Sequence, residues 1–159
     1  MSYERKTRVL LVDDHRVVRR GFKLILAAAP DLEVVAEASD GREALELAKT
    51  LQPNVVVIDV SMPGWNGIES TIRILEACPN TQVLALSMHR EAIYVREMLR
   101  AGAHGYLVKD ADDDTFVEAV RAVARGEGYL SPAVSKAVRV ADPSTWRIQH
   151  ISLQGVSRK

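Results

Sequence analysis

Short apolar runs separated by amphipathic stretches divide the first 128 residues into alternating segments. Three runs contain no polar residue before their ends, which is typical of strands buried on both faces of a parallel sheet. A fourth run ends on a serine, and another alternates in part. The strands are predicted at residues 8–12, 32–38, 55–59, 83–87 and 105–108.

Between these runs, apolar residues recur at helical spacing. The clearest case has Val18, Phe22 and Ile25 on one side and Arg16, Arg19 and Lys23 on the other. Breakers such as Pro30, Pro53 and Pro79 close successive segments. Helices are predicted after each strand: from about residue 16 to near 29, over 44–51, at about 67–77, near 91–101 and over 116–123 with a cap at Gly126, the fourth with the weakest periodicity. Five strand–helix pairs in strict alternation predict an α/β doubly wound, five-stranded parallel sheet with helices on both faces.

The pattern changes from Tyr129 onward. Turn signals occur at 131–132 and 142–143, and Val134, Val138 and Val140 allow at most a short helix between them. We expect residues 1–128 to form one domain and residues 129–159 to be a linker or tail. The last fifteen residues are weakly basic and lack a core, so no complete DNA-binding domain is predicted there.

Composition narrows the function classes. Among 159 residues, 21 Lys and Arg balance 21 Asp and Glu, so there is no overall basic field for nucleic acid or membrane. The single Cys78 excludes an internal disulfide. No apolar run reaches the length of a membrane span, and no signal peptide is apparent. We therefore expect a cytoplasmic protein without membrane contact.

Polar side chains end four of the five strands. Asp13 and Asp14 follow the first, and Asp59, Ser87 and Lys109 end the third, fourth and fifth. Carboxyl ends of parallel strands share one edge of the sheet, so these residues are expected to converge. Clustered carboxylates favour a hard cation such as Mg²⁺, while a lysine and a hydroxyl suit an incoming phosphoryl group. Asp59 would then be the nucleophile that forms an acyl phosphate.

Each of these residues also has a simpler interpretation. Asp13 or Asp14 is a candidate N-cap, Ser87 a turn residue and Lys109 a surface lysine. Four coincidences at four strand ends favour the functional interpretation. For His15, a role at the start of a helix is expected rather than metal binding. His104 and His150 are expected to be solvated, and Trp65 to be exposed as a partner contact or a cover for its loop.

The constellation resembles the receiver domain of two-component response regulators. The resemblance rests on Asp13-Asp14, Asp59, Ser87 and Lys109, with Met62-Pro63-Gly64 and Gly67, and it covers residues 8–128. Residues 11–15, 101–110 and 125–132 resemble the NarL/FixJ-type transcriptional regulators more narrowly. This resemblance implies a flavodoxin-like (βα)5 fold with strand order 2-1-3-4-5.

The resemblance also implies roles for individual residues. Asp59 is the expected phosphoacceptor. Mg²⁺ is expected on Asp14, Asp59 and the main-chain carbonyl of Ser61, with Asp13 acting through a water molecule. Ser87 and Lys109 are expected to bind the phosphoryl group, and Ser87 with Tyr106 to form the switch.

Three further positions are implied to tune the lifetime of the phosphorylated state: Ser61, Met88 and His89. Met88 is bulkier than the residue usual after this serine, and it is expected to narrow access to Asp59. The sequence does not decide whether His89 helps or hinders an attacking water. Asp110 stands where many receivers carry a proline, in agreement with the NarL/FixJ type.

The implied function is phosphorylation-controlled signalling rather than enzymatic turnover, with chemistry limited to self-phosphorylation and self-dephosphorylation. The expected partner is a sensor histidine kinase, and a homodimer is compatible with the resemblance. Output is expected through transcription, using a C-terminal helix-turn-helix domain that these 159 residues lack. The alternative is a stand-alone receiver acting through protein contacts. A magnesium-dependent phosphohydrolase with an Asp nucleophile fits less well, because such an enzyme places its nucleophile after the first strand.

Overall fold

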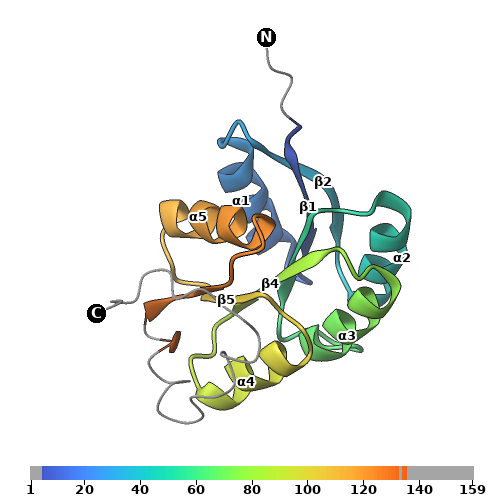
Figure 1. The fold of residues 1–159 in the computed structure, drawn as a ribbon, viewed down its shortest axis with the longest axis vertical. Helices are drawn as coiled ribbons and strands as arrows, with labels where there is room; N and C mark the ends of the chain where they lie inside the picture. The colour runs from blue at the N-terminus through green and yellow to red at the C-terminus, as the bar shows by residue number, and fades with distance from the viewer. Residues whose placement is uncertain (1–4, 133, 136–159) are drawn as a thin grey trace.

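The computed structural model describes residues 5–132 and 134–135. The predicted tail over 143–159, the short helix near Val138 and Val140, and His150 lie outside these residues. Within these residues, six strands form one sheet, and five helices of eight or more residues cover its two faces (Figure 1). The strands are β1 (Thr7–Val12), β2 (Leu32–Ala38), β3 (Val55–Asp59), β4 (Gln82–Ser87), β5 (Gly105–Val108) and β6 (Tyr129–Leu130), and the helices are α1 (Arg16–Ala27), α2 (Gly41–Leu51), α3 (Gly67–Ala77), α4 (Ala92–Arg100) and α5 (Asp113–Ala124).

The strand order is β2-β1-β3-β4-β5-β6, and every pairing is parallel. The predicted flavodoxin-like fold and the order 2-1-3-4-5 are confirmed. Each predicted helix is present with ends within a few residues of those expected. Because the strands are parallel, all their carboxyl ends lie at one edge of the sheet.

The central strand packs on both faces, which explains its unbroken apolar run. Val55 and Val57 belong to the core cluster that includes α1 and α5, whereas Val56 and Ile58 belong to the cluster that includes α2, α3 and α4. All four side chains are at most 1% exposed. Figure 1 shows the same division, with α1 and α5 on one side of the sheet and the other three helices opposite. Successive side chains of a strand point to opposite faces, so a strand between two helical layers needs an apolar residue at every position.

The sheet extends by one short strand beyond the five predicted. Tyr129 and Leu130, which the sequence analysis assigned to the linker, pair in parallel with Gly105 and Tyr106. Leu130 and Val134 are fully buried. Gly105 permits this close approach, since a Cβ there would lie 2.8 Å from the carbonyl oxygen of Tyr129. Two residues are too few to carry a periodic pattern, so this strand could not be found from the sequence.

No helix in the described part of the chain has both the length and the apolar character needed to cross a bilayer.

Candidate functional site

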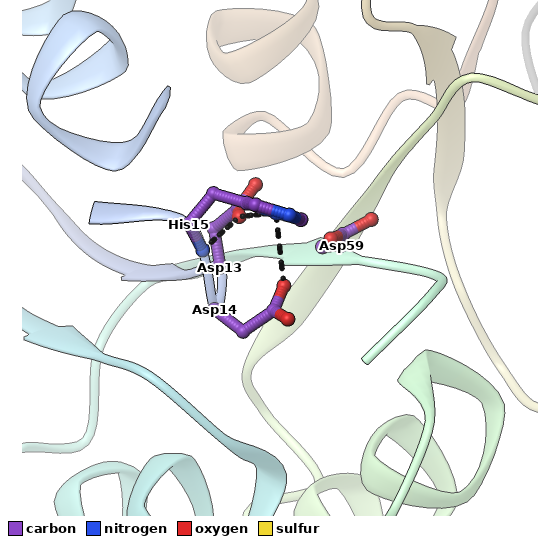
Figure 2. Close-up of side chains that lie close together, drawn as sticks. All are labelled: Asp13, Asp14, His15 and Asp59. Carbon is purple, nitrogen blue, oxygen red and sulfur yellow. Dashed lines mark hydrogen bonds and ion pairs between the residues drawn. The ribbon is translucent and has the colours of Figure 1, made fainter. Parts of the chain in front are cut away.

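Three carboxylates lie together at the carboxyl edge of the sheet. Asp13 and Asp14 directly follow β1, and Asp59 ends β3 (Figure 2). One ligand atom from each, together with one from His15, falls within 4.8 Å of the others. Asp13 is 3% exposed and Asp59 4%, so two of the three are almost fully withdrawn from solvent. The predicted convergence of the acidic residues is found in the structure.

Lys109 brings the counter-charge from the end of β5. Its ammonium nitrogen lies 3.0 Å from Asp13 Oδ2 and 3.3 Å from Asp59 Oδ2. The lysine side chain is only 12% exposed, so this is a largely buried contact and not the surface lysine of the alternative interpretation. Burial raises the pKa of the Asp59 carboxyl, Lys109 opposes this and Asp13 adds to it. Lys109 alone therefore does not compensate for the buried negative charge.

Asp14 provides a specific reason to expect a cation. Its Oδ1 is buried and has no hydrogen-bond partner among the described residues. His15 Nδ1 lies 3.2 Å away, a contact that counts as an ion pair only when the imidazole is protonated. A buried carboxylate oxygen without a donor is costly unless a cation or water reaches it. All-oxygen donors at this spacing fit a hard divalent ion such as Mg²⁺.

The start of α1 is shaped by Asp13 rather than by a capping side chain. His15 occupies the N-cap position, as expected for a helix-start role, but its side chain makes no capping hydrogen bond. Instead, Asp13 Oδ1 accepts the N–H of His15 at 2.8 Å. Arg19, which the sequence analysis placed only on a polar face, donates to the Asp13 carbonyl oxygen at 2.6 Å. Asp13 is thus held from both its side chain and its backbone.

The loop after β3 folds tightly against Asp59. The N–H of Ser61 donates to Asp59 Oδ1 at 3.2 Å, and Gly67 N–H donates to the Val60 carbonyl at 2.8 Å. A Cβ at Gly67 would lie 2.6 Å from the Asp59 carbonyl oxygen and 2.7 Å from Val60 Cα. Both contacts are with backbone, so only glycine fits here. The glycine after the central Asp therefore has a packing reason.

Ser87 and Tyr106 both bond to the backbone of His89. Ser87 Oγ accepts the His89 N–H at 2.9 Å, and the Tyr106 hydroxyl donates to the His89 carbonyl at 2.9 Å. Ser87 is 1% exposed and Tyr106 is fully buried. Burial raises the pKa of the Tyr106 phenol to about 12. The two residues predicted as a switch thus meet at one residue of the β4–α4 loop.

Surrounding positions depart from the sequence expectations in several ways. Met88 is 68% exposed, so its side chain lies at the surface of the β4–α4 loop. Trp65 is half-buried rather than fully exposed, with the guanidinium groups of Arg42 and Arg73 at 4.3 and 5.1 Å from its ring centroid. Its ring therefore lies against side chains of α2 and α3.

The expectation that His104 is solvated was wrong. Its ring Nδ1 accepts the backbone N–H of Val83 at 3.0 Å, while the backbone N–H of His104 donates to the Val83 carbonyl at 2.7 Å. Burial lowers the pKa of the imidazole. A lone histidine beside a strand carries no sequence signal that separates these two outcomes.

The protein-family model of the response regulator receiver domain matches residues 9–121 of the sequence. This chain therefore belongs to that family. Within the family it is of the NarL/FixJ type, as its relatives and structural neighbours indicate. The predicted resemblance is confirmed.

Two curated relatives illustrate the match. The chain is 42% identical over 132 residues to the transcriptional regulatory protein DegU of Brevibacillus brevis, covering 83% of this chain and 56% of DegU. It is 42% identical over 129 residues to the oxygen regulatory protein NreC of Staphylococcus carnosus (strain TM300), covering 80% of this chain and 59% of NreC. The chain thus spans little more than half the length of these relatives.

Solved structures of response regulators resemble this fold. A two-component response regulator of the LuxR family from Aurantimonas sp. SI85-9A1 superimposes with a TM-score of 0.82 at 34% identity, covering 86% of this chain and 97% of that one. The signal receiver domain of the putative response regulator NarL from Mycobacterium tuberculosis gives 0.75 at 37% identity, covering 78% of this chain and 100% of that one. The molecule is therefore a regulatory receiver domain of two-component signal transduction.

Proposed function

We propose that Asp59 accepts a phosphoryl group from a sensor histidine kinase. The observation that carries this proposal is the position of Lys109, 3.3 Å from Asp59 and 3.0 Å from Asp13 at an otherwise acidic edge. A carboxylate oxygen of Asp59 attacks the phosphorus atom, the bond from phosphorus to the donor breaks, and the leaving group departs with its electron pair. The product is an acyl phosphate on Asp59. Lys109 pairs with the phosphoryl oxygens as negative charge builds on them.

The metal assigned to this site is Mg²⁺. Asp14, Asp59 and the Ser61 main-chain carbonyl would hold it, and Asp13 would act through a bound water. When bound, the ion neutralises charge on the transferred phosphoryl group. The unpartnered Asp14 Oδ1 and the grouping of the three carboxylates support this assignment.

Phosphorylation then biases the surface around α4, β5 and α5. It adds roughly −1.5 to −2 charge at Asp59, which Ser87 and Lys109 can bind. Ser87 already contacts the His89 backbone, so a shift of the serine hydroxyl towards the phosphoryl group would change that contact. Tyr106, bonded to the same residue, would respond. Ser61, Met88 and His89 are assigned to tuning the lifetime of the acyl phosphate.

Output is proposed to be control of transcription, acting through a C-terminal helix-turn-helix domain in the whole protein. The relative DegU is a transcriptional regulatory protein, which supports this proposal. We propose residues 1–128 as the receiver and residues 129–159 as a linker or tail, of which Tyr129 and Leu130 pair with β5 as strand β6. A receiver acting in the cytoplasm through protein contacts, including a homodimer, is the alternative output. No observation favours a phosphohydrolase.

Intact-mass spectrometry after incubation with acetyl phosphate and Mg²⁺ tests the proposal. The expected result is one phosphoryl adduct that requires metal and is absent from Asp59→Asn. Asp114→Asn, an exposed acid in the first turn of α5, is the matched control and should still form the adduct. An adduct on Asp59→Asn, or none on the wild type, would contradict the proposal.

A further inference from the structure

One aromatic contact, between Tyr94 and His89, lies beside the site. The ring of Tyr94, from the first turn of α4, stacks on the imidazole of His89, with centroids 4.0 Å apart and planes 12° from parallel. The same ring reaches Ser61, with His89 Nε2 lying 3.5 Å from Ser61 Oγ. The Ser61 N–H in turn donates to Asp59 Oδ1. A short chain of contacts therefore runs from α4 to the acceptor carboxylate.

The backbone of His89 is fixed independently of its ring. Ser87 Oγ accepts its N–H and the Tyr106 hydroxyl donates to its carbonyl, both at 2.9 Å. The His89 side chain is 37% exposed, and its Nδ1 also lies 3.7 Å from Glu91 Oε1. The backbone contacts therefore leave the side-chain torsions of His89 free. The stacked Tyr94 ring is the contact best suited to select one orientation of the imidazole.

The selected orientation places the His89 ring against Ser61, whose N–H contacts Asp59. A water bridging His89 and Ser61 would need the two atoms to be about 5 Å apart. At 3.5 Å there is no room for it. A groove of about 350 Å³ has Ser61 and Tyr94 on its walls, so these two residues also line one surface depression.

Resting on the proposed function, we propose that Tyr94 is a positioning residue that holds the His89 imidazole against Ser61 as a cover over the Asp59 site. Loss of the stack frees the ring and opens the approach to water and to small phosphoryl donors. Because Tyr94 belongs to α4, the cover also depends on where that helix sits. A stacked pair is worth enough to change the ratio of covered to uncovered ring by about two- to tenfold.

The test compares Tyr94→Leu, which removes the ring, with Tyr94→Phe, which keeps it. Phosphorylation by acetyl phosphate and loss of the phosphoryl group are followed by intact mass at one pH and fixed Mg²⁺. Tyr94→Leu should accelerate both steps about two- to tenfold, and Tyr94→Phe should match the wild type. In a His89→Ala background, Tyr94→Leu should add nothing. Ile93→Ala, an exposed neighbour on α4, is the control.

An NMR measurement checks the stack without metal or phosphate. The carbon-bound ring protons of His89 should be shifted upfield by the Tyr94 ring, lose that shift in Tyr94→Leu and retain it in Tyr94→Phe. Unchanged rates in Tyr94→Leu, or an additive effect on His89→Ala, would overturn the assignment of Tyr94 while leaving receiver chemistry intact. Absence of any adduct on the wild type would instead remove the proposed function, and this inference with it.

Discussion

Lys109 Nζ lies 3.3 Å from Asp59 Oδ2, although their strands, β5 and β3, are separated in the sheet by β4. The lysine side chain spans that gap. It also contacts Asp13, which follows β1, the strand on the other side of β3. One buried cation therefore serves two buried carboxylates. This arrangement links the stability of the fold to the chemistry of the site.

Replacing Lys109 by Met should destabilise the protein in the absence of metal. Removing one partner of a buried ion pair leaves uncompensated charge, which typically costs about 3–5 kcal/mol in the free energy of unfolding. Urea unfolding with and without Mg²⁺ measures this, and added Mg²⁺ should stabilise the variant more than the wild type. Lys49→Met, which removes an exposed lysine from α2, should change stability by no more than about 0.5 kcal/mol. Equal losses in the two variants would contradict the assigned role of Lys109.

Two glycine-to-alanine changes should have opposite signs. At Gly67 a new methyl would collide with the backbone of Asp59 and Val60, so Gly67→Ala should cost about 1–3 kcal/mol. At Gly21, inside α1, a Cβ meets nothing within 4 Å, and alanine is the better helix former, so Gly21→Ala should gain about 0.5–1 kcal/mol. Chemical denaturation of both variants and the wild type measures these changes in the free energy of unfolding. A stable Gly67→Ala protein would show that the loop after β3 can move away from Asp59.

The sixth strand should contribute to the folded unit. Leu130 is fully buried, so Leu130→Ala should cost about 2–5 kcal/mol through lost apolar burial and a residual cavity. Leu24 on α1 is 67% exposed, and Leu24→Ala should stay within about 0.5 kcal/mol of the wild type. The comparison uses the midpoints of urea unfolding curves, provided that the variants share the same m-value. If both variants unfold like the wild type, strand β6 does not contribute to the stability of the folded unit.

His104 should make stability dependent on pH below neutrality. Its folded-state pKa is lowered from 6.5 by burial, so below about pH 6.5 the unfolded chain takes up a proton that the folded chain does not. The free energy of unfolding should therefore fall as the pH drops from about 6.5 towards the folded-state pKa, and level off below it. His104→Asn keeps an oxygen acceptor for the Val83 N–H and removes the titration. Urea unfolding between pH 5 and pH 8, chosen to span the pKa of free histidine at about 6.5, should show a shallower slope for this variant.

The sequence was sufficient for the fold and for most of the site because both depend on position along strands. Apolar runs such as 55–58 identify strands covered on both faces, and parallel strands bring their carboxyl ends to one edge. The strand order alone therefore predicts that Asp13, Asp14, Asp59 and Lys109 lie together. The grouping needed only the order of elements.

Contacts that depend on side-chain orientation were beyond the sequence. The stack of Tyr94 on His89 joins a helix to a loop and leaves no periodic trace. His104 looked solvated because nothing near it in the chain indicates that Val83 will supply its partner. Likewise, Arg19 reads as part of a polar helical face, whereas its guanidinium group turns back to the Asp13 carbonyl. Such contacts are set by packing between elements, not by local pattern.

The assembly of the acidic edge from distant strands has a consequence during synthesis. All three carboxylates lie within the first 59 residues, whereas their buried cation is residue 109. A nascent chain that has emerged only through β3 carries the negative charges without their ammonium partner. Pairing must wait until β5 and Lys109 have left the ribosome, by which time every strand except β6 has been synthesised. The acidic edge therefore stays without its ammonium partner while β1 to β4 are made.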